Sequence, residues 1–281
     1  MRGVLCSLSV AALVVTGCAG SAGKTAAPMG GSASTPVVVG PPRATTGERM
    51  TYRVTLHDVT LATFAIAVGE VTMLGDRKAI VVQAGAESSG MAALVKQVHS
   101  EFVTWLDAAT GDSLLFRVTE SSGGEDSPVE HNEARISELA DGTFPVLTKT
   151  EEGKELDEKQ VSPHRPTDFI AFLIGLRNWD GKTGEHRQLD VVRSRYMWRT
   201  DITLAGRKTV GTDLGDLPAV RFDAVAQRLM RDGSLDKGTE PRHFTIWVSD
   251  DADRVPLILV AQSDYGDIRM DIVDYTSPTN R

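Results

Sequence analysis

Three short stretches carry side chains whose types and spacing could support catalysis or ion binding. Ser234 and Lys237 have the Ser-x-x-Lys spacing of some acyl-enzymes, but they lie in a polar, turn-like loop without a prepared oxyanion hole. Residues 175–183 have five residues between their glycines, whereas a phosphate-binding loop has four and opens a helix. Residues 250–253 lack the central glycine and the terminal glutamate of an EF-hand calcium loop. The first and third stretches therefore predict turns, and the second predicts the end of a helix and the start of a strand, rather than active sites.

The histidines and carboxylates do not form a recognisable catalytic or metal-binding pattern either. No two histidines are three or four residues apart on a predicted helix, and no pair of carboxylates is singled out as acid and base. The six histidines are His57, His99, His131, His164, His186 and His243. We therefore expect no catalytic residue, no metal and no cofactor.

Cys18 is the side chain whose surroundings specify a reaction. It follows Val15-Thr16-Gly17, at the end of an apolar run of about a dozen residues that begins after Arg2. A charged start, a short apolar run and a small-residue end are typical of an export signal, and the run is too short to span a bilayer.

The order of residues around Cys18 resembles the bacterial lipobox. In that motif a signal peptidase cuts before the cysteine, and the thiol receives a diacylglycerol. We therefore expect cleavage between Gly17 and Cys18 and lipidation of Cys18. The alternative is an ordinary secretory signal that happens to end near a cysteine.

Composition limits what the rest of the chain can do. The other cysteine, Cys6, is lost with the signal, so the folded domain has no disulfide, zinc–thiolate site or cysteine nucleophile. The net charge is −8 without a basic tract, which argues against nucleic-acid binding. The lipid is therefore the expected contact with the membrane.

The chain divides into three parts on composition. Residues 1–17 are the lipoprotein signal peptide, and residues 18–42 form a flexible tether rich in Gly, Ser, Ala and Pro. Residues 43–281 form a single β-rich domain.

Most of this domain is predicted to be β-strand. Apolar and polar residues alternate in about twelve segments, which is typical of half-buried strands. These segments are 49–57, 59–73, 77–87, 102–106, 113–119, 129–136, 188–199, 201–210, 219–230, 242–249, 256–263 and 267–275. Residues 141–157 are charged and weakly alternating, which favours an exposed edge or loop, and residues 91–97 have helical spacing.

The longest apolar segment, residues 163–177, predicts one substantial helix. Pro166 and Asp168 are helix-start signals, and Arg177 suits the last turn. The segment is apolar around almost its whole circumference, so the helix should be buried, and at roughly 18 Å it cannot span a bilayer. Because strands and helices do not alternate, a doubly wound parallel sheet is excluded. We predict a large, curved antiparallel sheet or half-open barrel of about twelve strands, with the helix against its concave face.

A helix in the mouth of a curved sheet either packs solidly or leaves a cavity for an apolar ligand. The aromatic and aliphatic residues of such a cavity would otherwise be ordinary core. The candidate lining residues are Phe169, Phe172, Leu173, Leu176, Trp105 and Trp247.

Three stretches, residues 47–54, 168–177 and 247–257, together resemble an uncharacterised exported bacterial family, the domain of unknown function 3108. The resemblance implies a fold and an exported compartment, but no activity. The expected shape is also similar to the half-open β-barrels of periplasmic lipoprotein carriers, which shelter acyl chains beneath a helical lid. That similarity concerns the fold alone.

The leading interpretation is a non-enzymatic, lipid-anchored protein of the cell envelope. Ala19 lacks the aspartate that commonly marks inner-membrane retention, which favours the periplasmic face of the outer membrane. The expected partner is a lipid, an acyl chain or another envelope protein. The alternative is a structural or assembly lipoprotein with a solid core, and an envelope hydrolase comes third.

Overall fold

A single fifteen-stranded sheet organises the part of the chain that the computed structural model describes, residues 40–89, 98–122, 129–150 and 153–278. The lipobox, most of the tether and the helical segment predicted over 91–97 lie outside the described residues. The strands are β1 (Arg49–Leu56), β2 (Val59–Leu74), β3 (Arg77–Ser88), β4 (Val98–Asp107), β5 (Ser113–Ser122), β6 (Val129–Ala134), β7 (Thr143–Thr150), β8 (Glu155–Val161), β9 (Thr167–Asp168), β10 (His186–Arg193), β11 (Tyr196–Thr212), β12 (Gly215–Leu229), β13 (Arg242–Ser249), β14 (Pro256–Ser263) and β15 (Gly266–Thr276). The helices are the 3-10 helix η1 (Ile136–Glu138) and α2 (Phe169–Leu176).

The sheet consists of two meanders that meet where the first strand pairs with the last. Its order runs from β8 down to β1, then to β15, and from there down to β9. Neighbouring strands are antiparallel except for β9 and β10, which pair in parallel. The end strands β8 and β9 do not pair with each other, so the sheet stays open, as the predicted half-open barrel requires.

The predicted strand count of about twelve was too low. The three additional strands are β7, β8 and β9, of which the first two come from the charged, weakly alternating segment 141–157. The boundary expected at Thr200 was also wrong, because Thr200 lies in the middle of β11. The chain turns instead at Ser194, which adopts a φ of 53°, a conformation that its sequence context does not indicate.

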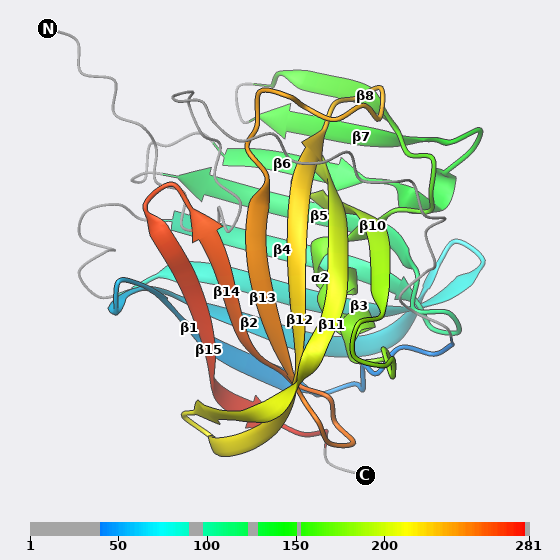
Figure 1. Ribbon diagram of the computed structural model, residues 1–281. Coiled ribbons are helices and arrows are strands. Elements are labelled where there is room, and N and C mark those ends of the chain that lie inside the picture. Colours follow the sequence, from blue (N-terminus) through cyan, green and yellow to red (C-terminus); the bar gives the residue numbers. More distant parts are fainter. Residues whose placement is uncertain (1–39, 90–97, 123–128, 151–152, 279–281) are drawn as a thin grey trace, which may run out of the picture.

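The apolar face of each meander points into the space between them. In β1, for example, Met50, Tyr52 and Val54 are buried, while the residues between them are half-buried. Figure 1 shows the blue-to-green half of the sheet behind the yellow-to-red half, with α2 between the two. The sheet therefore encloses its own core, and α2 occupies the concavity.

Helix α2 forms within the predicted segment 163–177 and is buried as predicted, but it is shorter than predicted. Residues 163–168 are not helical, and Thr167–Asp168 form strand β9 beside β10. All its residues from Ile170 to Leu176 are buried, and Phe169 is partly buried. The structure differs at the two ends. Asp168 is the N-cap rather than a first-turn residue, and Arg177 is the C-cap. Within the described residues, no helix combines the length and the apolarity needed to cross a bilayer.

Candidate functional site

The N-terminus of α2 is fixed by the fully buried carboxylate of Asp168. Its Oδ1 accepts the backbone N–H groups of Ile170 and Ala171, both at 2.9 Å. Its Oδ2 accepts the hydroxyls of Thr104 and Ser113, both at 2.5 Å. Burial raises the pKa of Asp168, although these four hydrogen bonds oppose the shift. Because neighbouring groups already occupy both oxygens, this carboxylate positions the helix on β4 and β5 instead of facing a ligand.

The C-terminus of α2 is fixed by a buried ion pair between Arg177 and Glu48. The two side chains are 3% and 2% exposed and form two parallel hydrogen bonds, of 2.9 and 2.6 Å. Arg177 also donates to the backbone carbonyl of Asp253, and the hydroxyl of Tyr275 donates to Glu48 at 3.0 Å. This cluster joins the helix to the start of β1, to the loop before β14 and to β15.

The three stretches that carry the family resemblance meet at this cluster. Glu48 comes from the first, Arg177 from the second, and the carbonyl of Asp253 from the third. The neighbouring Arg254 donates to the backbone carbonyl of Trp179 at 2.8 Å, which holds the chain just after α2. The motif residues therefore hold the helix in place.

An apolar pocket lies between α2 and the inner face of the second meander. Its volume is about 50 Å³, far below the 300–1,000 Å³ of typical small-molecule sites. Its lining residues are Phe169, Phe172, Val191, Arg193, Trp198, Thr200, Ala226, Phe244, Leu259 and Ala261. The rings of Phe172 and Phe244 meet edge to face across it, 6.2 Å apart.

The six residues that the sequence suggested for an apolar ligand are distributed over three environments. Phe169 and Phe172 line the pocket. Leu173 and Leu176 are buried in the packed core around α2. Trp105 and Trp247 lie on the opposite face of the sheet. The guanidinium of Arg117 covers Trp105, and Lys208 and Arg221 cover Trp247.

Sequence reasoning missed the wall that β10–β14 contribute to the pocket. Thr200 pairs with Ala226, and Phe244 pairs with Ala261, so each pair brings one alanine to the pocket wall. The alternation of apolar and polar residues along each strand shows which of its side chains point toward the core. Which strands lie beneath α2 depends on pairings between distant parts of the chain.

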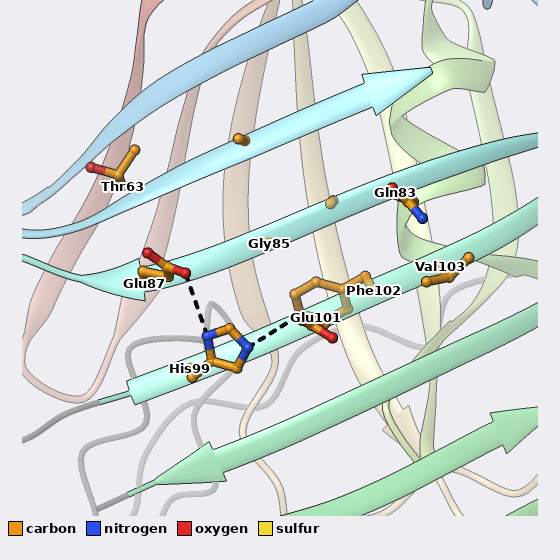
Figure 2. A pocket seen from close by; sticks show the side chains of 10 residues that line it. Thr63, Gln83, Gly85, Glu87, His99, Glu101, Phe102 and Val103 are labelled. Carbon is orange, nitrogen blue, oxygen red and sulfur yellow. Dashed lines mark ion pairs between the residues drawn. The ribbon is translucent and has the colours of Figure 1, made fainter. Parts of the chain in front are cut away.

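A shallow hollow on the outer face of β2–β4 contains the most suggestive polar group (Figure 2). His99 lies between Glu87 and Glu101, with its Nδ1 3.7 Å from Glu87 Oε1 and its Nε2 3.2 Å from Glu101 Oε1. The hollow, of about 420 Å³, lies over the small residues Ala65 and Gly85. The side chains of His99, Glu87 and Glu101 are 46–76% exposed, so solvent screens their contacts and the group is an exposed surface cluster.

A larger hollow of about 630 Å³ lies on the outer face of β10–β15. Here Asp201 accepts from His186 and Gln188, and Arg221 donates to Asp223 at 2.7 Å. These carboxylates are engaged with neighbours on the sheet surface. Within the described ranges, no three His, Cys, Asp or Glu side chains are placed to hold a metal ion.

The short motifs of the sequence form turns. The hydroxyl of Ser234 donates to Asp232 at 2.6 Å. Asp251 accepts the hydroxyl of Ser249 and the backbone N–H groups of Asp253 and Arg254, which is the pattern of a turn-forming aspartate.

Three solved structures match this chain to different degrees. A β-barrel-like protein of the domain of unknown function DUF1849 from Brucella abortus matches with a TM-score of 0.56 and 10% identity, covering 84% of this chain and 100% of that chain. A candidate exported protein with a YmcC-like fold from Bacteroides fragilis has a TM-score of 0.36 and 8% identity, covering 85% and 100%. A candidate lipoprotein from Parabacteroides distasonis has a TM-score of 0.32 and 7% identity, covering 84% and 99%.

The first of these similarities supports the fold alone. No curated protein matches the chain. The model of the family described as "Protein of unknown function (DUF3108)" matches residues 51–273, which is nearly all of the β-rich domain. The resemblance seen in the three sequence stretches is thereby confirmed, and the chain belongs to the DUF3108 family.

Proposed function

We propose that this chain is a non-enzymatic, lipid-anchored protein of the bacterial cell envelope that binds a short part of an acyl chain. The observation that carries the proposal is the apolar pocket between α2 and β10–β14. Phe169, Phe172 and Phe244 give it aromatic walls, and Ala226 and Ala261 leave the space beneath them. Cys18 supplies the anchor, and Ala19 favours the periplasmic face of the outer membrane.

The size of the pocket sets what it can hold. A volume of about 50 Å³ corresponds to roughly two water-sized groups, since a water occupies about 30 Å³ in the liquid. Each methylene removed from water contributes about 0.8 kcal/mol, so two or three of them contribute about 2 kcal/mol. The proposed binding is therefore weak and reversible, unlike the sheltering of a whole chain in an open barrel.

The pocket is expected to keep this size, because α2 is held at both ends. Asp168 connects its start to β4 and β5, and Arg177 connects its end to Glu48. Moving the helix to admit a longer stretch of chain would break both buried clusters. A ligand that exchanges through the mouth of the pocket leaves both buried clusters intact.

Pentane should bind the Cys18→Ala chain, which lacks the lipid and needs no detergent. We expect saturable shifts of the methyl signals of Ala226, Ala261 and Leu259 in NMR spectra of methyl-labelled protein. In the matched variant Ala226→Leu the added side chain fills the pocket, and these shifts should disappear. The methyl signals of Val82, in the other meander, should be the same in both proteins and report that Ala226→Leu is folded. If pentane leaves the pocket signals unchanged, the solid-core assembly role replaces this proposal.

The anchor has a separate test. Wild-type protein should sediment with membranes, and Cys18→Ala should move to the supernatant, because the thiol that carries the lipid is gone. The control is Cys6→Ala, which alters a cysteine that the signal peptidase removes and should sediment like the wild type. Membrane sedimentation of Cys18→Ala would contradict lipid anchoring.

A further inference from the structure

The hairpin that joins β2 to β3 extends beyond the rest of the sheet. β1 pairs with β2 only as far as Ala67, and β4 pairs with β3 only from Ala79 onward. Within the described residues, the stretch 70–78 therefore has no strand neighbour outside the hairpin itself. All its residues are exposed except Leu74, which is half-buried. This tip projects from the body of the domain.

One face of the projecting tip is apolar. Val71 and Met73 are 54% and 57% exposed. They continue the row of β2 side chains that points to the core, because Val71 lies opposite the core residue Ile80 and Met73 lies opposite Lys78. A single exposed apolar side chain needs no explanation, but apolar side chains grouped on one face indicate a contact surface.

The tether that carries Cys18 enters the domain beside this hairpin. Thr46 Oγ1 donates to the backbone carbonyl of Gly69 at 3.0 Å, and the backbone N–H of Gly47 donates to the carbonyl of Val68 at 2.9 Å. Figure 1 shows the start of the domain, in blue, on the same side of the molecule as the hairpin. A lipid on Cys18 therefore brings this side of the domain to the bilayer.

We infer that the hairpin face formed by Val71, Met73 and Lys78 rests on the bilayer that holds the lipid anchor. Lys78 lies beside Met73, so its ammonium group reaches the lipid phosphates while the apolar side chains contact the acyl chains. Asp76 occupies the turn and is costly to desolvate, so the hairpin lies along the surface and does not enter it tip first. The inference rests on the proposed lipid anchor and adds how the domain is oriented on the membrane.

A fluorescent label on the hairpin face tests the contact, because the processed chain is expected to have no free thiol. Lipidated protein with Met73→Cys carries a nitrobenzoxadiazole dye and is reconstituted in phosphatidylethanolamine–phosphatidylglycerol vesicles. We expect the emission of the dye to shift to the blue. A lipid with a nitroxide on its acyl chain should then quench most of this emission.

The matched control is Val59→Cys, labelled in the same way. Val59 is on the same strand and is 56% exposed, but it lies at the opposite end of β2. Its label should keep its emission in the same vesicles. Adding Val71→Asp to the Met73→Cys chain should also restore the emission, because a carboxylate opposes burial among acyl chains.

Flotation of the vesicles separates failure of this inference from failure of the anchor. If the labelled protein floats with the vesicles but Met73→Cys is quenched no more than Val59→Cys, the hairpin inference is wrong while the lipid anchor stands. An unchanged emission on adding Val71→Asp would contradict it equally. If the lipidated chain does not float with the vesicles, the anchor and this inference both fail.

A second copy of the chain is the other occupant that the experiment tests. The double variant Cys18→Ala/Met73→Cys, labelled and free of vesicles, should emit at the same wavelength at every protein concentration. A blue shift that grows with concentration would identify a second copy on the hairpin face and overturn the inference.

Discussion

Arg177→Met should lower the free energy of unfolding by about 3–5 kcal/mol, because it leaves the buried Glu48 carboxylate without its partner. The loss includes both parallel hydrogen bonds and the contact with the Asp253 carbonyl. In urea unfolding followed by tryptophan fluorescence, this loss should appear as a lower urea concentration at the midpoint. The slope of the unfolding free energy against urea concentration should stay unchanged.

The matched control for this prediction is an exposed ion pair made by a residue of β1. Arg53 pairs with Asp213 at 2.9 Å, and both side chains are more than 40% exposed. Arg53→Met should therefore cost less than about 1 kcal/mol. The double variant Glu48→Gln/Arg177→Met removes both charges and should be more stable than Arg177→Met. Equal losses for Arg53→Met and Arg177→Met would contradict the role assigned to the buried pair.

Asp168→Ala should cost about 3 kcal/mol or more. It removes an N-cap, worth about 1 kcal/mol, and leaves the buried hydroxyls of Thr104 and Ser113 without their acceptor, at about 1–3 kcal/mol for each group left unpaired. Asp168→Asn is the matched control. It keeps an oxygen for the helix N–H groups and should cost clearly less. A loss for Asp168→Ala no larger than for Asp168→Asn would mean that these hydrogen bonds contribute little.

Asp168 also predicts a pH dependence with a defined sign. Because burial raises the folded-state pKa of Asp168 above its ordinary value of 3.8, the folded protein binds this proton more tightly than the unfolded chain. The stability that the folded protein gains from this tighter proton binding is fully present below the pKa of the unfolded chain. It is lost as the pH rises through the raised pKa of the folded protein. Wild-type protein should therefore lose stability relative to Asp168→Asn across that interval in urea titrations at successive pH values. A constant difference between the two proteins would exclude the shift.

The helix and most of the strands could be predicted from the sequence, because their signals are local. A segment that is apolar all round can only be buried, and strands such as β13 show their alternation directly. The charged strands β7 and β8 lack that contrast, and the turn at Ser194 has no glycine or asparagine to mark it.

The candidate site was harder to predict, because its parts meet through long-range pairing. Trp105 lies between Thr104 and Leu106, and the inward position of the polar Thr104 is explained only by its bond to Asp168. Trp247 shares a face of β13 with His243 and Thr245, so the alternation of this strand already places it opposite Phe244 and Ile246. Phe169 and Phe172 were identified because they belong to the helix itself.

In the described part of the chain, β8 is a border of the open sheet and has a strand neighbour on one side only. Its sequence is rich in charge, with Glu155, Asp157, Glu158 and Lys159 within seven residues. Bare borders of this kind invite a second copy to add its own strand. Molecules confined to a membrane surface, as proposed for this chain, meet far more often than molecules free in three dimensions. The hydrated, mainly acidic side chains of β8 would then act as spacers that prevent neighbouring copies from joining into filaments on a crowded surface.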